Sequence, residues 1–126
     1  MIFSIGLDLV ELDRFEKALE RSGERFRERI FTPAEREAAA ALGRSLEFLA
    51  GRFAAKEAVF KCLGTGWAKG VRWKDLEILS LPSGAPVLTL SGKAREVAAL
   101  LGITAWHISI THTHRTAAAV ALAEKA

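Results

Sequence analysis

The chain has 126 residues, a length that predicts one domain, residues 1–126, able to bury a core without disulfides or a structural metal. Its single cysteine, Cys62, excludes an intrachain disulfide, and we expect it to be a small buried side chain. The net charge of +3 favours an anionic partner, without deciding between nucleic acid, a phosphorylated small molecule and an acidic protein.

The first residues, "MIFSIGLDLVEL", contain no basic leader. No run in the chain approaches the roughly 18 apolar residues that a membrane span needs. We therefore expect a soluble cytoplasmic protein that does not use a membrane as its partner.

Hydrophobic periodicity and capping residues predict four helices and five strands. The first segment expected to be a helix is 14–30, with a potential break at Ser22-Gly23. The second begins at Pro33, behind a Thr32 cap with Glu35 as its capping-box residue, and stops at Gly43. The others are 46–63 behind a Ser45 cap and 92–101 behind a Ser91 cap. The segments expected to be strands are 2–10, 75–81, 86–90, 105–114 and 116–124. Helices that cluster early and strands that cluster late predict an α+β fold, with the helices packed on a mostly antiparallel sheet.

The stretch "RFAAKEAVFKCLGTG", residues 52–66, places charged groups in an otherwise apolar helix. Glu57 and Lys61 are four residues apart, so their ordinary interpretation is an intrahelical ion pair. Two observations favour another one: the helix offers little polar surface, and Asp8 lies in the middle of an apolar strand. Two such carboxylates predict a Mg²⁺ site, because this ion takes one or two protein carboxylates and completes its shell with waters and phosphates.

The same stretch ends in Gly64-Thr65-Gly66, directly after the predicted helix. Lys61, one turn from Glu57, would face the phosphates of a metal-bound ligand. The glycines would let the backbone approach that ligand closely, although a glycine in this place is also an ordinary helix C-cap.

The stretch "WHISITHTH" predicts a strand with His107, Ser109 and Thr111 on one face and isoleucines on the other. These polar side chains either form the solvent-exposed side of a sheet or line a pocket for an anion. His112 and His114 have no cysteine and no obvious third ligand nearby, which argues against a zinc site.

The basic residues of the first predicted helix fall on one stripe, separate from its hydrophobic and acidic residues: Arg14, Lys17, Arg21 and Arg25. The stripe is either part of a solvated helix with charge pairs between successive turns, or a basic edge that orients an acidic partner. The sequence leaves both interpretations open.

Three segments resemble a known family in order and spacing: "IGLDLVELDR", "RFAAKEAVFKCLGTG" and "WHISITHTH". They are similar to the motifs of holo-acyl-carrier-protein synthases, the short 4′-phosphopantetheinyl transferases of fatty-acid biosynthesis, and the central block is the most specific. The resemblance implies transfer of 4′-phosphopantetheine from coenzyme A to a serine of apo-acyl carrier protein, with adenosine 3′,5′-bisphosphate as the other product. It also implies a homotrimer with active sites between subunits.

The resemblance further implies roles for individual residues. Asp8 and Glu57 would hold Mg²⁺, and Lys61 would contact a phosphate. These three residues would form the catalytic group. The residues implied at the coenzyme are Arg52, Lys61, Gly64, Thr65, Gly66, Pro86, His107 and Thr111. The residues implied to dock the carrier protein are Arg14, Arg21 and Arg25.

Two points stay open at the level of sequence. The acceptor of the serine proton is either Glu57 or a metal-bound water, and Thr113 stands where some relatives carry an acidic residue.

The competing interpretation is a small basic module that binds RNA or a phosphorylated ligand without catalysis. It rests on the charge and the arginine stripe, but the chain contains no tyrosine and no stacking motif typical of single-strand binders.

Overall fold

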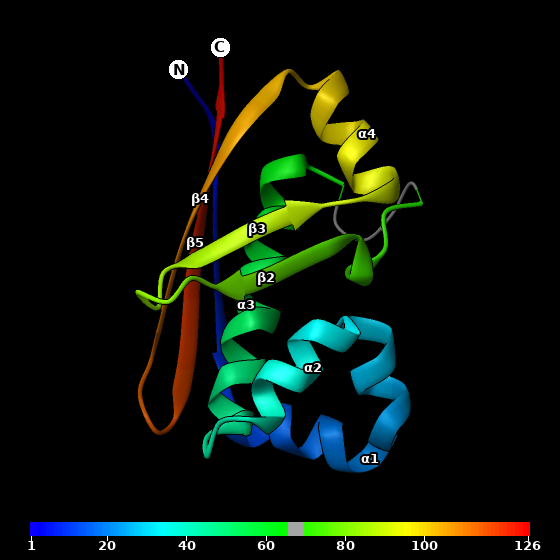
Figure 1. Cartoon of the computed structure of the whole chain (residues 1–126), viewed down its shortest axis with the longest axis vertical. Coiled ribbons are helices and arrows are strands. Elements are labelled where there is room, and N and C mark those ends of the chain that lie inside the picture. The colour runs from blue at the N-terminus through cyan, green and yellow to red at the C-terminus, as the bar shows by residue number, and fades with distance from the viewer. Residues whose placement is uncertain (66–69) are drawn as a thin grey trace.

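The structure is a computed structural model that describes residues 1–65 and 70–126 (Figure 1). Its helices are α1 (Leu12–Ile30), α2 (Pro33–Ala40), α3 (Ser45–Leu63) and α4 (Gly92–Leu100), with a short 3₁₀ helix η1 (Trp73–Asp75). Its strands are β1 (Ile2–Glu11), β2 (Leu76–Ser80), β3 (Pro86–Leu90), β4 (Ile103–His112) and β5 (Thr116–Lys125). The predicted order of elements and the α+β class are confirmed.

The strands form two antiparallel sheets. One has three strands in the order β1-β5-β4, and the other is the β2-β3 hairpin. Because β1 and β5 pair along their whole length, the two chain ends lie side by side (Figure 1), and the Met1 amino group donates to the Lys125 carbonyl at 3.0 Å.

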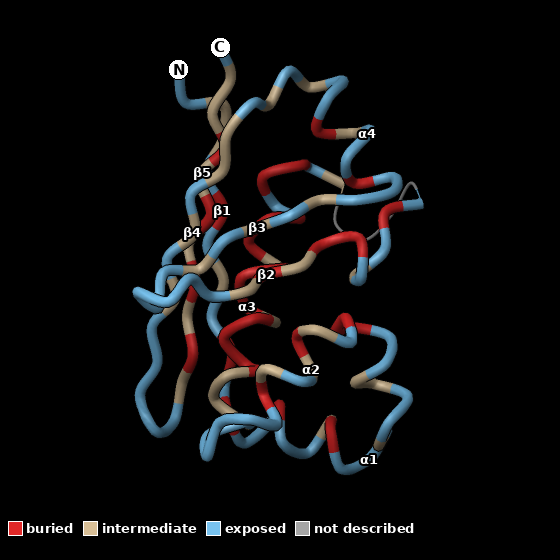
Figure 2. The backbone as a smooth tube through the Cα atoms, in the orientation of Figure 1, coloured by how far each residue is buried: buried red, intermediate tan, exposed pale blue. Residues whose placement is uncertain are grey.

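Helix α3 is the centre of the core, and buried residues concentrate along it and along β5 (Figure 2). It packs closely on the three-stranded sheet because small residues meet there. A Cβ on Gly6 would lie 2.0 Å from the Ala58 carbonyl oxygen, and one on Gly51 would lie 2.8 Å from Ile110 Cγ2. The facing side of β5 presents only buried alanines: Ala117, Ala119, Ala121 and Ala123.

The opposite face of this sheet is open, and its β1 strand is apolar. Ile5, Leu7 and Leu9 on β1 are 60%, 64% and 68% exposed. Side chains alternate along a strand, so the covered face of β1 carries Gly6 and Asp8 instead. The chain therefore turns the more polar side of β1 toward its own core.

The helix boundaries test the capping predictions. The capping box at Thr32 and Glu35 is present, with both of its hydrogen bonds. The prediction for Ser45 is wrong, because this residue is the first of α3 and Arg44 occupies the N-cap without a side-chain bond. Gly23, at φ 55° and ψ −137°, interrupts α1 as expected for the Ser22-Gly23 break.

Within the ranges 1–65 and 70–126, no helix combines the length and the hydrophobicity needed to cross a membrane.

Candidate active site

Asp8 reaches the site from the covered face of β1. Its neighbour Gly6 lets α3 approach the strand, and this places the Asp8 side chain, 18% exposed, beside the last turns of α3. A carboxylate in this half-buried position needs a compensating charge.

Glu57 and Lys61 come from α3 and meet Asp8 there. The Lys61 ammonium lies 3.2 Å from Asp8 Oδ1 and donates to the Leu7 carbonyl at 2.7 Å. Lys61 thus forms its ion pair with Asp8 of β1. The intrahelical ion pair between Glu57 and Lys61, which is the ordinary interpretation of their spacing, is not formed. Burial, followed by the negative charge of Asp8, raises the pKa of the Glu57 carboxyl, while Lys61 acts to lower it.

A cleft of about 970 Å³ opens between β1, α1 and α3 at this point. Asp8 and Glu57 line it together with aromatic side chains of α1 and α3: Phe15, Phe26 and Phe53. The cleft therefore joins an acidic pair to an apolar wall.

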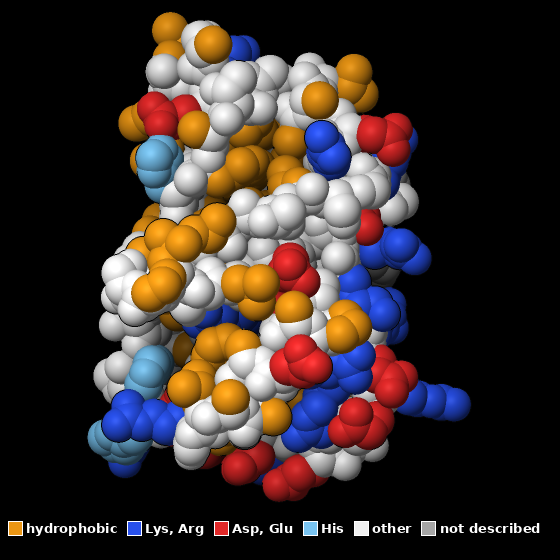
Figure 3. Space-filling model, viewed as in Figure 1, with side chains coloured by type: hydrophobic (Ala, Val, Ile, Leu, Met, Phe, Trp, Pro, Cys, Tyr) orange, Lys and Arg blue, Asp and Glu red, His pale blue; other side chains and the backbone are white. Residues whose placement is uncertain are grey.

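The basic stripe of α1 lies partly on this cleft. Arg14, Lys17 and Arg21 line it, whereas Arg25 lies beyond the break at Gly23 and is not among the lining residues. Figure 3 shows charged side chains of both signs gathered over the end of the molecule that α1 and α2 form. The predicted basic stripe is thus divided by the break at Gly23, and three of its four residues line the same cleft as Asp8 and Glu57.

Arg52, in another part of α3, contacts the β2-β3 hairpin, whose strand β3 begins at Pro86. The Arg52 guanidinium is buried, stacks on Phe48 at 3.9 Å, and donates to the Ile78 carbonyl at 3.3 Å and to Ser80 Oγ at 2.6 Å. Ser80 pairs with Pro86 in the β2-β3 hairpin. Burial lowers the pKa of Arg52, and the charge of Glu35 opposes this. Arg52 therefore faces the hairpin, whereas Glu57 faces β1 and α1.

His107, Ser109 and Thr111 lie on the open face of the three-stranded sheet, where all three are exposed. This confirms the predicted alternation of β4. The His107 ring bonds to Glu124 of β5, with 2.5 Å between Nε2 and Oε1. Within one chain, these residues and the Asp8–Glu57 pair lie on opposite faces of the sheet.

Gly64 ends α3 in the left-handed conformation, at φ 73°, and its N–H donates to the Phe60 carbonyl. It is therefore a helix C-cap, the ordinary role considered for it. Thr65 is the last residue before the gap in the described ranges, and Gly66 lies outside the described residues.

The family model described as the 4′-phosphopantetheinyl transferase superfamily matches residues 4–122. The chain belongs to this superfamily.

Proteins similar to this transferase, both in sequence and in structure, are holo-[acyl-carrier-protein] synthases. The holo-[acyl-carrier-protein] synthase of Solidesulfovibrio magneticus is 55% identical over 98% of this chain and 99% of its own length. The crystal structure of the synthase from Neisseria meningitidis matches with a TM-score of 0.91 at 34% identity, covering 99% of this chain and 100% of that one. The synthase from Bacillus anthracis, solved in complex with CoA (3′,5′-ADP), matches with a TM-score of 0.82 at 40% identity. The match covers 100% of this chain and 99% of that one.

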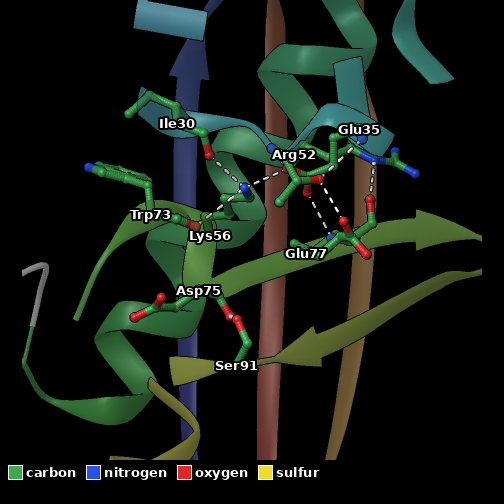
Figure 4. Close-up of polar contacts among 10 residues, drawn as sticks. Ile30, Glu35, Arg52, Lys56, Trp73, Asp75, Glu77 and Ser91 are labelled. Carbon is green, nitrogen blue, oxygen red and sulfur yellow. Dashed lines mark hydrogen bonds and ion pairs between the residues drawn. The ribbon is translucent and has the colours of Figure 1, made fainter. Parts of the chain in front are cut away.

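Sequence reasoning missed one set of polar residues in this transferase, the buried network around Lys56 (Figure 4). Lys56 and Glu35 are both 0% exposed and form an ion pair at 2.6 Å. The hypothesis that the charges of the apolar helix meet a metal and phosphates is therefore wrong for Lys56. The sequence signal for this network was Glu35, the capping-box residue of α2. Its carboxylate also accepts a hydrogen bond from the Ile78 N–H at 2.7 Å.

Two other residues of the chain have structural partners. The Thr113 hydroxyl accepts hydrogen bonds from the Arg115 and Thr116 N–H groups at 3.1 Å and so shapes the β4-β5 turn. Cys62 is buried, its thiol donates to the Ala121 carbonyl at 3.3 Å, and burial raises its pKa. The expectation of a small buried side chain at Cys62 is confirmed.

Proposed function

We propose that this chain is a transferase that moves 4′-phosphopantetheine from coenzyme A to a serine of apo-acyl carrier protein in fatty-acid biosynthesis. The observation that carries the proposal is a full-length relative of this name at 55% identity. The cleft lined by Asp8 and Glu57 supports it, as does the ion pair between Asp8 and Lys61. The family match favours this activity over the RNA-binding module that the charge alone also allowed.

In this reaction the serine oxygen bonds to the phosphorus that carries pantetheine. The bond from that phosphorus to the bridging oxygen breaks, and adenosine 3′,5′-bisphosphate leaves with that oxygen. Such transfers depend mainly on positioning and on neutralising charge at the phosphoryl group. The site must therefore supply positive charge, orientation and an acceptor for the serine proton.

We propose Asp8 and Glu57 as the residues that hold Mg²⁺. The donor set fits: two carboxylates are close enough for the charge of one to raise the pKa of the other, and hard cations prefer oxygen ligands. No third acidic, histidine or cysteine side chain joins them in the described part of the chain, and this ion commonly completes its shell with waters and phosphates. When bound, Mg²⁺ would neutralise charge on the coenzyme pyrophosphate.

The chain's own groups would do the rest. Lys61, whose side chain is 54% exposed, can reach a phosphate oxygen and stabilise its charge. Glu57 is the chain's own candidate for accepting the serine proton, because its carboxylate lines the cleft beside Asp8.

Arg14 and Arg21 are proposed to dock the acidic surface of the carrier protein, with Arg25 as a further contact beyond the break in α1. The first two line the cleft that holds the acidic pair. A carrier bound to them would bring its serine to Asp8 and Glu57.

The proposed coenzyme contacts are Arg52, Lys61, Gly64, Thr65, Gly66, Pro86, His107 and Thr111. One chain does not gather them: Arg52 and Pro86 adjoin the hairpin, and His107 and Thr111 lie on the open sheet face. Arg52 would also have to exchange its bond to Ser80 for a phosphate. A second copy of the chain would have to complete the site.

We propose for this reason that copies of the chain assemble, and the resemblance to the family implies that the assembly is a homotrimer. The open face with Ile5, Leu7 and Leu9 exposed is an apolar surface suited to burial against another copy. Sedimentation at working concentration should give the mass of three chains of 13.7 kDa; a monomer would contradict the shared site. The cytoplasmic location stays a prediction.

Intact-mass spectrometry tests the activity. Apo-acyl carrier protein incubated with this protein, coenzyme A and Mg²⁺ should gain the mass of one phosphopantetheine, and a chelator should prevent the gain. If several carrier proteins gain no mass, the proposal fails. A gel shift with RNA over a salt series would then test the binding module, whose affinity should fall steeply with salt.

A further inference from the structure

Lys61 forms an ion pair with Asp8, one of the two carboxylates that the proposed function assigns to the metal. Its ammonium lies 3.2 Å from Asp8 Oδ1, and the Leu7 carbonyl accepts a second hydrogen bond from it at 2.7 Å. Within the described residues, these are the hydrogen bonds of Lys61. The residue assigned to the phosphate is thus paired with Asp8 rather than with Glu57.

We propose that Lys61 holds the place of the divalent cation before the cation binds, and that the cation displaces it toward the substrate phosphate. The proposal rests on the metal site of the proposed function. It gives Lys61 two successive partners, Asp8 in the free protein and a phosphate oxygen in the loaded one.

Electrostatics require a positive group at this place in the free protein. Asp8 and Glu57 repel each other, and their negative charges lie in a partly buried setting where unpaired charge is costly. Lys61 offsets part of this repulsion, as its influence on the pKa of Glu57 indicates. A divalent cation at the same carboxylates would replace this role and would repel the ammonium.

The side chain of Lys61 can make this change without a rearrangement of the fold. It is 54% exposed, and its backbone is fixed in the last turn of α3, just before the Gly64 cap. Only the flexible four-carbon stem has to move. The displaced ammonium regains an anionic partner when phosphate arrives, so metal and phosphate should bind cooperatively.

The test measures Mn²⁺ binding to the full chain without coenzyme A, by electron paramagnetic resonance of the free ion. Lys61→Met should bind Mn²⁺ about fivefold more tightly than the wild type, since an exposed ion pair is worth up to about 1 kcal/mol, which corresponds to about fivefold in affinity. Lys61→Gln should behave alike. Lys93→Met, at an exposed lysine of α4, removes the same charge away from the cleft and should leave the affinity unchanged.

Two results would overturn the proposal in different ways. Unchanged or weaker Mn²⁺ binding by both Lys61 variants, with binding lost in Asp8→Asn, would refute the displacement and leave the metal site standing. Binding by Asp8→Asn at the wild-type affinity would refute the metal site itself, and with it the displacement.

Discussion

Replacing Lys56 by methionine should destabilise the protein by about 3–5 kcal/mol, because it leaves the Glu35 carboxylate buried without its cation. Lys56 and Glu35 are 0% exposed. A loss of this size is a large share of the roughly 5–15 kcal/mol that holds a domain of this kind together.

The magnitude follows from what the ammonium contacts. Lys56 Nζ donates to Glu35 Oε1 and to the Ile30 carbonyl, each at 2.6 Å, and to the Trp73 carbonyl at 3.4 Å. It therefore joins the end of α1, the start of α2 and η1 to α3. Burial lowers the pKa of Lys56, and the charge of Glu35 opposes this most strongly among its neighbours, so Glu35 is the main compensation for burying the ammonium.

Urea unfolding of Lys56→Met, Glu35→Gln and the double variant provides the assay. The double variant should be more stable than the sum of the two single losses predicts, by about 2 kcal/mol, because residues in one buried network couple to this degree. Lys93→Met should change the free energy of unfolding by less than about 0.5 kcal/mol. A loss below about 1 kcal/mol for Lys56→Met, or strict additivity, would refute the reasoning.

Three further predictions concern the site and its surroundings. Glu57→Gln should stabilise the protein at pH 7 by up to about 1 kcal/mol. Because folding raises the pKa of Glu57 above its ordinary value of 4.5, the ionised carboxylate destabilises the folded state at pH 7. In thermal unfolding below pH 4.5 the gain should vanish, because the carboxyl is then protonated in both states. Gly6→Ala should cost about 3 kcal/mol or more in urea unfolding, because its Cβ would lie 2.0 Å from the Ala58 carbonyl oxygen. Charge reversal at Arg14 and Arg21 should weaken carrier binding at least about tenfold in calorimetry without changing coenzyme A affinity; equal loss of both would mean that α1 is only structural.

The element order could be predicted from the sequence because it depends on local patterns. The meeting of Asp8 with Glu57 and Lys61 is not local, since Asp8 and Lys61 are 53 residues apart. It was expected from two carboxylates in apolar segments and from the resemblance to the family. Periods of two and of 3.6 residues distinguish strands from helices. The spacing of Glu57 and Lys61 places them on one side of α3, and a carboxylate in an apolar strand indicates an unusual environment for Asp8. The break at Gly23 was indicated by the same kind of local signal.

The partners of buried charges could not be predicted in this way. Glu35 is 21 residues from Lys56, and nothing in either segment specifies the other. The capping box explained Glu35 locally, so its second oxygen and its ion pair went unnoticed. Likewise, the helix stretch gave no sign that Arg52 and Glu57 would face different elements, since their contacts depend on how α3 packs between two sheets.

The exposed face of the three-stranded sheet shows a second limit. Alternation along β1 separates Ile5 and Leu7 from Gly6 and Asp8 but does not say which face is covered. The close approach of α3 at Gly6 decides it, and leaves the apolar face without cover inside one chain. Burial of that face in the proposed trimer would depend on contacts between chains, which single-chain patterns do not encode.

The most direct test of the account is the rate of phosphopantetheine transfer by Glu57→Gln, followed by intact-mass spectrometry with Mg²⁺ and coenzyme A in excess. Glu47→Gln, in the first turn of the same helix and not among the residues lining the cleft, is the matched control. We predict a loss of about a hundredfold or more for Glu57→Gln and a rate within about twofold of the wild type for Glu47→Gln. Wild-type rate and unchanged magnesium dependence in Glu57→Gln would contradict the assignment of this carboxylate to the catalytic centre.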